Sequence, residues 1–302
     1  MFPTLSYLLR YMTGWNLPLP VPTFGFFMAL AFWAAYAVFT LEFRRKQRLG
    51  TIPADIRVGP LMDRLLLWCG LIGFAGALLL SKLEDNYGLW HHPWQWLIRY
   101  HGLTYYGGLL FGAVTYLVIL HRRGISLATA ADIGSPGMLL AYATGRLGCH
   151  LAGDGDWGIA NRLPKPHWLS WLPDEAWAAH YPHNVLRQGV FIPGCHLDYC
   201  AVLPDAVFPT SLYEFVVCLL LFFVLWSLRR RLTAPGMLFC IYALFIGLER
   251  FLVEYIRITP RHVFFGWTLS QAQLISLGFM LIGITGISYI LTTSAKKTYF
   301  YC

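Results

Sequence analysis

A charged segment interrupts otherwise apolar sequence between Gly145 and Gly158, which reads GRLGCHLAGDGDWG. Arg146 and His150 lie four residues apart, and Asp154 follows at the same interval. Residues at this spacing share one face of an α-helix, so a helix that continued through the segment would align the three side chains. This stripe is the first candidate site.

A second stripe of charge lies in the segment ERFLVEYIR, where Arg250, Glu254 and Arg257 recur at helical spacing. Ionisable groups are costly inside a bilayer and usually pair or line a polar interior, so we expect the two stripes to face each other. One interpretation is an internal salt bridge, formed by Glu254 with Arg250 or Arg146, that only holds helices together. The other is an outward-opening polar cavity with surplus positive charge, which suits an anionic lipid headgroup because guanidinium groups pair bidentately with phosphate.

Residues in two further stretches support such a cavity. The glycines of YYGGLLFG would let neighbouring helices or a lipid chain approach closely, although helix packing alone explains them as well. The stretch FPTSLYE opens an apolar segment with a proline near the first helical turn and places a tyrosine and a glutamate at its external boundary. A simple N-terminal helix charge explains that glutamate equally well. These residues are Gly107, Gly108, Gly112, Pro209, Tyr213 and Glu214.

The composition is that of a membrane protein. Of the 302 residues, 57% are hydrophobic and only 13% are charged, whereas a soluble domain has about 25% charged residues. Seven segments have the length of roughly 17 to 25 residues that a transmembrane helix needs. We therefore predict an all-α, polytopic membrane protein with about seven transmembrane helices and an external (periplasmic) helical or loop head. The segments are Val21 to Leu41, Leu65 to Ser81, Gly102 to Leu120, Asp132 to Leu151, Pro209 to Leu228, Pro235 to Glu254 and Leu269 to Thr293.

Basic residues concentrate in alternate loops. Lys and Arg in short loops stay on the cytoplasmic side, which predicts an external N-terminus and a cytoplasmic C-terminus. Anchoring beside anionic lipid accounts for most of the net charge of +8, so we expect no nucleic-acid partner. The basic residues in these loops and in the tail are Arg44, Arg45, Lys46, Arg48, Arg57, Arg64, Arg122, Arg123, Arg229, Arg230, Arg231, Lys296 and Lys297.

The chain contains no internal repeat and is expected to form one membrane domain over residues 1–302. Residues 1–20 are expected to lie along the outer interface. The external segments 82–101 and 158–208 are rich in Trp and His, which is typical of an aromatic belt, and 158–208 is expected to form an external loop or head. Within it, the oxidising location would allow a disulfide between Cys195 and Cys200, whereas their spacing is not a standard zinc pattern.

Seven short motifs follow one another over about Phe24 to Ile282. They are YGGLLFG, D-x-x-x-P (Asp132, Pro136), GRLG (Gly145 to Gly148), an acidic glycine loop ending at Gly158, P-x-x-LYE (from Pro209), R-x-x-x-E-x-x-R (from Arg250) and Q-x-x-S (Gln273, Ser276). In this order they resemble the bacterial prolipoprotein diacylglyceryl transferases. The family's seven-span topology with an external N-terminus agrees with the distribution of charge.

The resemblance implies transfer of a diacylglyceryl group from phosphatidylglycerol to the thiol of the lipobox cysteine in the signal peptide of a secreted prolipoprotein, with release of glycerol phosphate. It implies an enzyme of the bacterial cytoplasmic (inner) membrane that works among membrane lipids, and we expect neither a cofactor nor a metal. Arg146 corresponds to the essential arginine of the family's GR[IL]GN signature, and Arg250 with Glu254 to its second charged cluster.

The sequence departs from the family pattern at several positions. Cys149 stands where the signature has asparagine, and Asp154 is taken as the acidic residue of the following glycine loop. Phe24, Tyr106 and Phe208 occupy positions where family members have tyrosine or histidine. The phosphate-binding half of the site therefore matches the family better than the half that would handle the thiol.

These considerations assign a role to each candidate residue. Arg146 and Arg250 would hold the phosphodiester and neutralise the leaving phosphate, while Glu254 and Asp154 would orient them. His150 is a candidate base, Tyr106 would donate a hydrogen bond, and the nearby arginines would do most to ionise the thiol. Substrate-binding roles are expected for Gly107, Gly108, Asp154, Gly158, Tyr213, Glu214, Arg257 and Gln273.

Two other classes of function remain open from the sequence. A paralogue could use the same phospholipid with a different acceptor. A non-catalytic lipid-binding scaffold or a transporter would belong to another class, and a transporter is disfavoured because the chain lacks the repeats and paired broken helices that transporters show.

Overall fold

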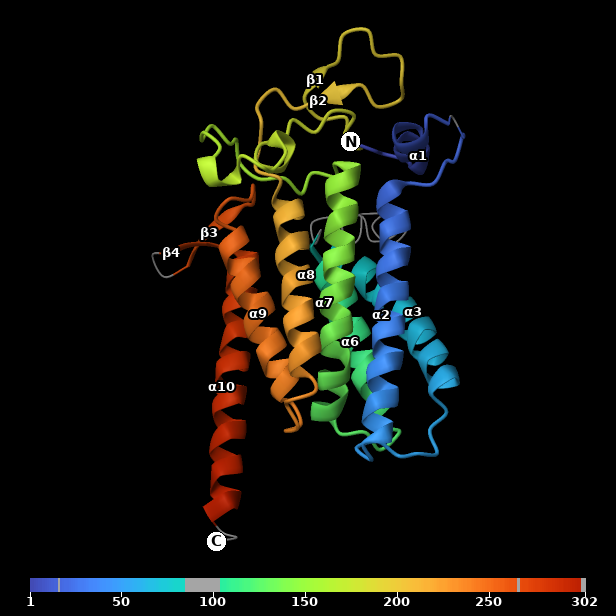
Figure 1. The fold of residues 1–302 in the computed structure, drawn as a ribbon, viewed down its shortest axis with the longest axis vertical. Coiled ribbons are helices and arrows are strands. Elements are labelled where there is room, and N and C mark those ends of the chain that lie inside the picture. The colour runs from blue at the N-terminus through green and yellow to red at the C-terminus, as the bar shows by residue number, and fades with distance from the viewer. Residues whose placement is uncertain (16, 85–103, 265–266, 300–302) are drawn as a thin grey trace. The chain divides into compact units, whose positions relative to one another are not determined.

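The computed structural model of the chain is mostly helical and describes residues 1–15, 17–84, 104–264 and 267–299 (Figure 1). A helix covers most or all of each of the seven predicted apolar segments. These helices are α2 (Thr23–Arg48), α3 (Val58–Glu84), α6 (Tyr105–His121), α7 (Leu127–Ala152), α8 (Thr210–Leu228), α9 (Met237–Val253) and α10 (Gln271–Tyr299). Four of them, α2, α3, α8 and α10, are long and apolar enough to cross a membrane by length and composition, and α6 is a shorter apolar helix.

The chain divides into two compact units. One comprises Met1–Ala35 and Ser135–Cys302, and the other comprises Tyr36–Gly134. The candidate charged residues all fall in the first unit, whereas Tyr106 and the glycines of YYGGLLFG fall in the second.

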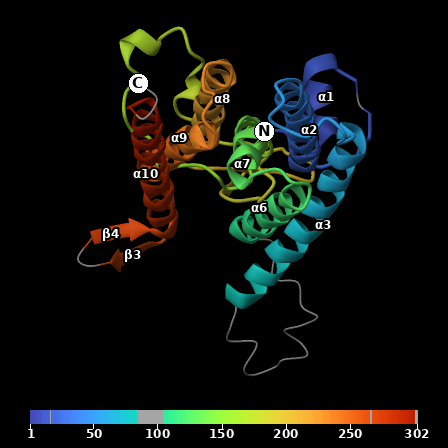
Figure 2. The ribbon, with the colours of Figure 1, turned by 90° about the horizontal axis from the view of Figure 1, so that it is seen from below.

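In the unit Tyr36–Gly134, helices α3 and α6 pack side by side along glycines (Figure 2). A Cβ atom added to Gly107 would lie 2.4 Å from the carbonyl oxygen of Gly76, and one added to Gly73 would lie 3.2 Å from that of Gly108. Only hydrogen side chains permit such close backbone approach. Helix packing therefore accounts for these glycines, and a substrate-binding role for Gly107 and Gly108 stays a prediction.

In the other unit, α9 and α10 form the most extensive helix contact, and it too depends on glycine. A Cβ atom on Gly247 of α9 would lie 2.8 Å from the carbonyl oxygen of Ser276, and one on Gly283 of α10 would lie 2.7 Å from that of Cys240. Helix α8 packs against the other side of this pair through contacts with α9. The result is a three-helix assembly in which the N-terminal end of α8 and the C-terminal end of α9 lie on the same side (Figure 1).

Residues 153–209 form a head of loops and short elements at that side of α7 and α8 (Figure 1). It contains the 3₁₀ turns η1 (His167–Leu169) and η2 (Asp174–Ala176) and the antiparallel strands β1 (Val190–Phe191) and β2 (Ala201–Val202). Its core is a small cluster of buried residues. They are Trp157, Ala179, Tyr181, Leu203 and Val207.

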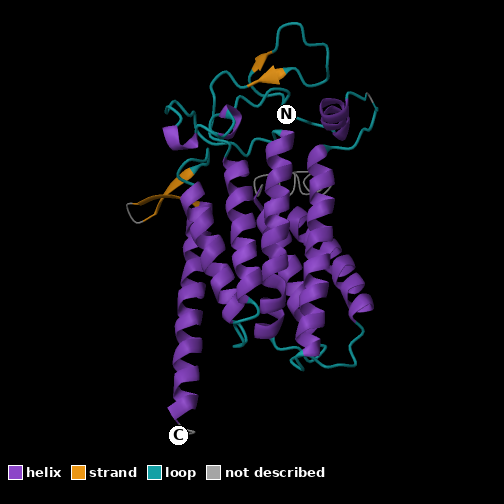
Figure 3. Cartoon of the chain, viewed as in Figure 1, coloured by secondary structure: helices purple, strands orange, loops and turns teal. Residues whose placement is uncertain are grey.

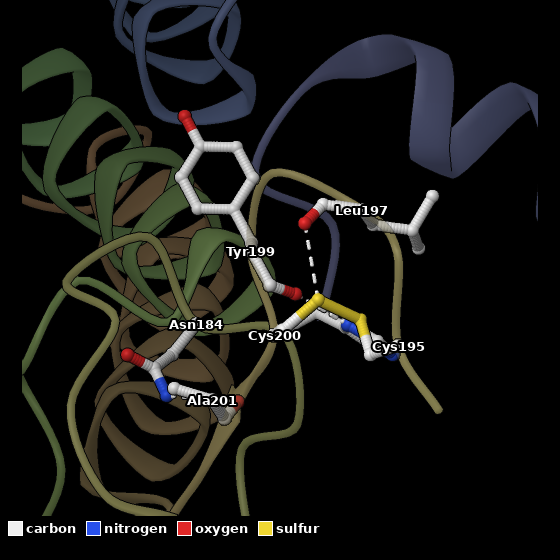
Figure 4. The surroundings of a disulfide bond; sticks show 7 residues. Asn184, Cys195, Leu197, Tyr199, Cys200 and Ala201 are labelled. Atoms are coloured by element: carbon white, nitrogen blue, oxygen red, sulfur yellow. Dashed lines mark hydrogen bonds between the residues drawn. A yellow bond between two sulfur atoms is a disulfide. The ribbon is translucent and has the colours of Figure 1, made fainter. Parts of the chain in front are cut away.

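A disulfide joins Cys195 and Cys200 in the loop between β1 and β2 (Figure 4). The bond occupies both thiols, which removes them as metal ligands. Helix α1 (Leu5–Thr13) lies in the N-terminal part of the same unit, where residues 1–20 were expected to form an interfacial segment. The other expected external segment, 82–101, falls mostly on residues 85–103, outside the described residues.

The all-α prediction is correct for the helical segments but missed two short hairpins (Figure 3). Besides β1 and β2, the strands β3 (Arg261–Phe264) and β4 (Trp267–Ser270) pair antiparallel between α9 and α10. Strands of two to four residues carry too little hydrophobic alternation to be detected in the sequence.

The glycine contact between α3 and α6 generates a stability prediction. We expect Gly107→Ala to lower the free energy of unfolding by roughly 1–3 kcal/mol, because the methyl group would press against the backbone of Gly76. Thermal unfolding of the purified protein in detergent measures this change. The matched control is Gly70→Ala in α3, where an added Cβ meets no atom within 4 Å; a loss of the same size in both variants would contradict the packing argument.

Candidate active site

The carboxylate of Glu214 is the centre of a cluster of charged side chains. Glu214 is the fifth residue of α8, near the N-terminal end of the helix, and is fully buried. Its Oε2 atom lies 2.9 Å from Nε of Arg146, and its Oε1 atom lies 2.6 Å from Nη1 of Arg250 and 3.4 Å from Nη1 of Arg257. One carboxylate thus draws together three guanidinium groups from α7, α9 and the loop after α9.

A second carboxylate, Asp156, bridges two of the same arginines. Its side chain accepts hydrogen bonds from Nη1 of Arg146 and from Nη2 of Arg257. Its main-chain carbonyl accepts hydrogen bonds from the hydroxyls of Thr210 (2.7 Å) and Ser211 (3.1 Å) at the start of α8. Asp156 therefore ties the loop after α7 both to the arginines and to the N-terminal end of α8.

Asp156 lies in a loop that follows the C-terminal end of α7. Helix α7 ends at Ala152, and Gly153 and Gly155 adopt positive φ values of 66° and 96°. The expectation that a continuing helix would put Asp154 on the same stripe as Arg146 is therefore wrong, since Asp154 lies in this glycine loop. Glycine is the residue that most readily takes up such left-handed conformations, which makes the turn possible.

Gly158 positions Arg257 through backbone contact. The main chain of Gly158 forms a bridge with Arg257, and the amide of Ile159 donates to the carbonyl of Ile256 at 2.9 Å. A Cβ atom on Gly158 would lie 2.4 Å from that same carbonyl oxygen. The glycine predicted to bind substrate therefore brings two loops together and sets the position of an arginine in the cluster.

Two further carboxylates lie on the C-terminal part of α9. Glu254 is 1% exposed, and its Oε2 atom lies 3.3 Å from Nη2 of Arg250. Glu249 is 5% exposed, and neither of its carboxylate oxygens has a hydrogen-bond partner among the described residues. A buried carboxylate in that state is costly, which marks Glu249 as a residue of functional interest that the motif comparison did not use.

The predicted surplus of positive charge is not found in this cluster. The three guanidinium groups are matched by the carboxylates of Asp156, Glu214 and Glu254, each of which lies in an ion pair with at least one of them. The expected pair of Glu254 with Arg250 is present, but it lies within the end of α9, and the ion pairs that join different elements are made by Glu214 and Asp156 instead. A guanidinium group has five N–H donors, however, so the paired arginines keep donors for an incoming anion.

The two aspartates of the glycine loop titrate differently. Burial alone would raise the pKa of Asp156, but Arg146, Arg257 and Arg250 outweigh it and hold that pKa below its ordinary value. Burial and the negative charge of Asp156 raise the pKa of Asp154. Ligand atoms of both aspartates lie within 4.8 Å of the Cys149 thiol, a grouping that could hold a metal ion, but a cation there would compete with the two guanidinium groups already bound to Asp156.

His150 lies outside this network of ion pairs. Its Nδ1 atom is 3.1 Å from the hydroxyl of Tyr181, and the two rings meet edge to face with centroids 5.6 Å apart. The contact gives one ring nitrogen of His150 a hydrogen-bond partner, the hydroxyl of Tyr181 in the head. A role for His150 as a base stays a prediction.

Other predicted substrate-binding residues make structural contacts. The hydroxyl of Tyr213 donates to the carbonyl of Trp177 at 3.1 Å, which fastens the head to α8. The side-chain oxygen Oε1 of Gln273 accepts a hydrogen bond from the backbone amide of Ser270 at 3.0 Å, and the backbone amide of Gln273 donates to the Ser270 hydroxyl at 3.1 Å. This reciprocal pair is a capping box at the start of α10.

Two residues of the cluster could have been found in the sequence. Tyr142 is four residues before Arg146, and the Arg146 guanidinium carbon lies 4.8 Å from the centre of its ring. Its hydroxyl is also 3.4 Å from Oε1 of Glu214. Asp156 was passed over for Asp154 because both acids of GDGDWG fit an acidic glycine loop, and only the course of the loop distinguishes them.

Most of the chain, including this cluster, resembles one protein family. The sequence profile of the prolipoprotein diacylglyceryl transferases matches residues 13–289. The chain belongs to the prolipoprotein diacylglyceryl transferase family. Arg146, Arg250 and the glycine loop ending at Gly158 all lie inside the matched range.

Curated relatives of this family are 24–31% identical to the chain over the aligned residues. A protein named phosphatidylglycerol–prolipoprotein diacylglyceryl transferase in Cutibacterium acnes is 31% identical over 234 residues, which cover 75% of this chain and 68% of the relative. Proteins of the same name in Treponema pallidum and Lactobacillus acidophilus are 25% identical over 292 residues and 27% identical over 286 residues. These two alignments cover 87% and 94% of this chain and 85% and 90% of the relatives.

The bridging role of Asp156 generates a prediction for stability and its pH dependence. We expect Asp156→Asn to lower the free energy of unfolding by about 3 kcal/mol at neutral pH, because Arg146 and Arg257 lose their shared anion. A carboxylate whose pKa is lower in the folded than in the unfolded protein stabilises the fold above the unfolded pKa of about 3.9, and this contribution is lost as the pH falls through the folded pKa. The difference between wild type and variant should therefore shrink below about pH 4.

Denaturant unfolding in detergent at several pH values measures this difference. The matched control is Asp205→Asn, which removes a largely exposed carboxylate of the same head whose nearest cation, on Arg162, is 4.0 Å away. A loss of equal size in the control, or a loss at Asp156 that does not change with pH, would show that the bridge does not stabilise the protein.

Proposed function

We propose that this protein transfers the diacylglyceryl group of phosphatidylglycerol to the lipobox cysteine of a prolipoprotein signal peptide. The observation that supports it best is the convergence of Arg146, Arg250 and Arg257 on Glu214, inside a family whose curated relatives are named for this reaction. Planar guanidinium groups held at fixed positions can bind a phosphodiester through paired hydrogen bonds. The enzyme would be a multi-pass protein of the bacterial inner membrane, with seven transmembrane helices and with residues 158–208 as a periplasmic head.

The reaction in this proposal is a displacement at a glyceryl carbon. The lipobox thiol loses its proton, the sulfur forms a bond to that carbon, and the bond from the carbon to the phosphate oxygen breaks. Glycerol phosphate leaves with the bonding electrons. Arg146 and Arg250 would neutralise the charge that grows on the leaving phosphate, and such fixed donors are most effective where water is excluded.

The carboxylates have a positioning role in this scheme. Glu214 holds Arg146 through Nε and Arg250 through Nη1, and Asp156 holds a further nitrogen of Arg146. Fixing the guanidinium groups before the lipid arrives lowers the entropic cost of binding it. Since the cluster is balanced in charge, an entering phosphodiester would make it negative, and the proton released by the thiol could restore the balance at one of its carboxylates.

The salt-bridge network by itself would equally fit a lipid-binding scaffold or a paralogue with another acceptor. A scaffold would tolerate the loss of Arg146 without loss of function. A paralogue would need Arg146 but would not attach lipid to lipobox cysteines. Complementation of a bacterium depleted of its own transferase, read out as diacylglyceryl attachment to its lipoproteins, separates the three functions.

The same assay tests the two principal arginines. We expect Arg146→Ala and Arg250→Ala each to lower transfer by about 10²-fold or more, because a donor to the leaving group contributes several kcal/mol in the transition state. Arg146→Lys and Arg250→Lys should show little more transfer than the alanine variants, since an ammonium group does not reproduce the paired hydrogen bonds of a planar guanidinium group. Arg162→Ala, which removes an arginine whose side chain is 83% exposed in the head, is the matched control and should keep full activity. Normal transfer in a correctly folded Arg146→Ala or Arg250→Ala protein would show that the cluster has only a structural role.

The proposed topology predicts which positions react from outside the cell. In a background without native cysteines, we expect Pro193→Cys to react with a membrane-impermeant maleimide in intact cells, and Arg44→Cys and Arg230→Cys to react only after lysis. All three native residues are exposed, so failure to react does not reflect burial. Labelling of position 44 in intact cells would reverse the orientation and place the cluster at the cytoplasmic end.

A further inference from the structure

A groove lies between α3 and α6 in the unit Tyr36–Gly134, with a volume of about 540 Å³. This volume falls within the range of about 300–1,000 Å³ that is usual for ligand sites. Along α3 it is lined by Trp68 and Ile72, and along α6 by Val114, Val118 and Ile119. Its wall is therefore mostly apolar.

Three arginines close one end of this groove. Arg64 lies four residues before Trp68 on α3, and Arg122 and Arg123 follow the last turn of α6. Because α3 begins and α6 ends at this side, the basic ends of the two antiparallel helices coincide. In the described part of the chain, the side chains of these three arginines are exposed and make no hydrogen bond or ion pair.

A second hollow of about 270 Å³ adjoins the groove at Arg64 and Arg123, which line both. Arg57 and the carboxylate of Asp55 also line it. The four arginines around the two hollows outnumber this single carboxylate, so the combined site is cationic. Its polar end has room for a headgroup, and its long wall suits an acyl chain.

We propose that this groove binds one anionic phospholipid. The phosphate would lie against Arg64, Arg122 and Arg123, and an acyl chain would run along Trp68 and Val118. Unpaired guanidinium groups at the end of an apolar groove complement a lipid that carries negative charge at one end only. The site shares no residue with the cluster around Glu214, so the proposal does not depend on the enzymatic activity.

The test uses two phospholipid probes that carry a photoactivatable diazirine in one acyl chain. One is phosphatidic acid and the other is phosphatidylcholine, each at trace level in nanodiscs of zwitterionic lipid that contain the full-length protein. Mass spectrometry of the digested protein maps the labelled peptides, which separates this groove from the cluster around Glu214. We expect the anionic probe to label residues 64–72 and 114–123 more strongly than the zwitterionic probe, by roughly tenfold.

Replacing the three arginines tests the charge requirement. The triple variant Arg64→Gln, Arg122→Gln, Arg123→Gln should lose this excess labelling. The matched control Arg44→Gln, Arg230→Gln, Arg231→Gln removes three exposed arginines elsewhere and should keep it. Equal labelling of the groove by both probes, or an equal loss in both triple variants, would overturn the proposal.

Two further measurements test whether misfolding of the variants or binding of a free anion could explain the labelling result. Val118→Trp fills the groove and leaves every arginine in place, so it should lower labelling while thermal unfolding stays close to wild type. Excess inorganic phosphate should not compete with the phosphatidic acid probe, because the acyl chain contributes to binding. Unchanged labelling in Val118→Trp, or full competition by phosphate, would contradict a phospholipid site.

Discussion

The sharing of one buried carboxylate among three arginines is the interaction on which the candidate site depends. Glu214 has no exposed surface, and Arg146, Arg250 and Arg257 are all at least four-fifths buried. Charges taken out of water at this level are stable only if each has a counter-charge and further hydrogen bonds. The positions of α7, α8, α9 and the loop after α9 are therefore constrained together, because moving any of them would leave a buried charge without its partner.

The glycine loop that carries Asp156 is a second connection between the arginines and α8. Asp156 meets Arg146 and Arg257 through its side chain and the start of α8 through its main chain, while Gly158 allows the loop to touch the backbone beside Arg257. The loop is thus held by electrostatics on one side and by backbone hydrogen bonds on the other. A short loop anchored in this way can place a carboxylate as accurately as a helix does, which is the requirement for orienting a guanidinium group.

Much of this arrangement could be predicted from the sequence, and the failures have physical causes. The seven apolar segments were long enough to reveal their helices, and helical spacing correctly paired Arg250 with Glu254. The predicted helical stripe did not extend to Arg257, because α9 ends at Val253 and Arg257 lies in the loop after it. Helical spacing was also extended past Ala152 into a loop where glycines end the helix, so the expected stripe wrongly included Asp154. Asp154 was preferred to Asp156 because both acids fit an acidic glycine loop. The ion pairs of Glu214 could not be predicted either, since they join it to arginines that are 36 positions or more away in the sequence.

The disulfide of the head bears on how the protein is assembled. Cys195 and Cys200 are only five positions apart, so the ring between β1 and β2 is small and its closure needs no contact with the rest of the chain. Disulfides form outside the reducing cytoplasm, so in the proposed topology, with a periplasmic head, the bond would form only after this segment had been translocated. The redox state of this cysteine pair would then report whether the head of a given molecule has been exported. A molecule whose head had never left the cytoplasm would carry two free thiols there and could still retain the ion pairs of Arg146 and Arg250, which involve neither cysteine.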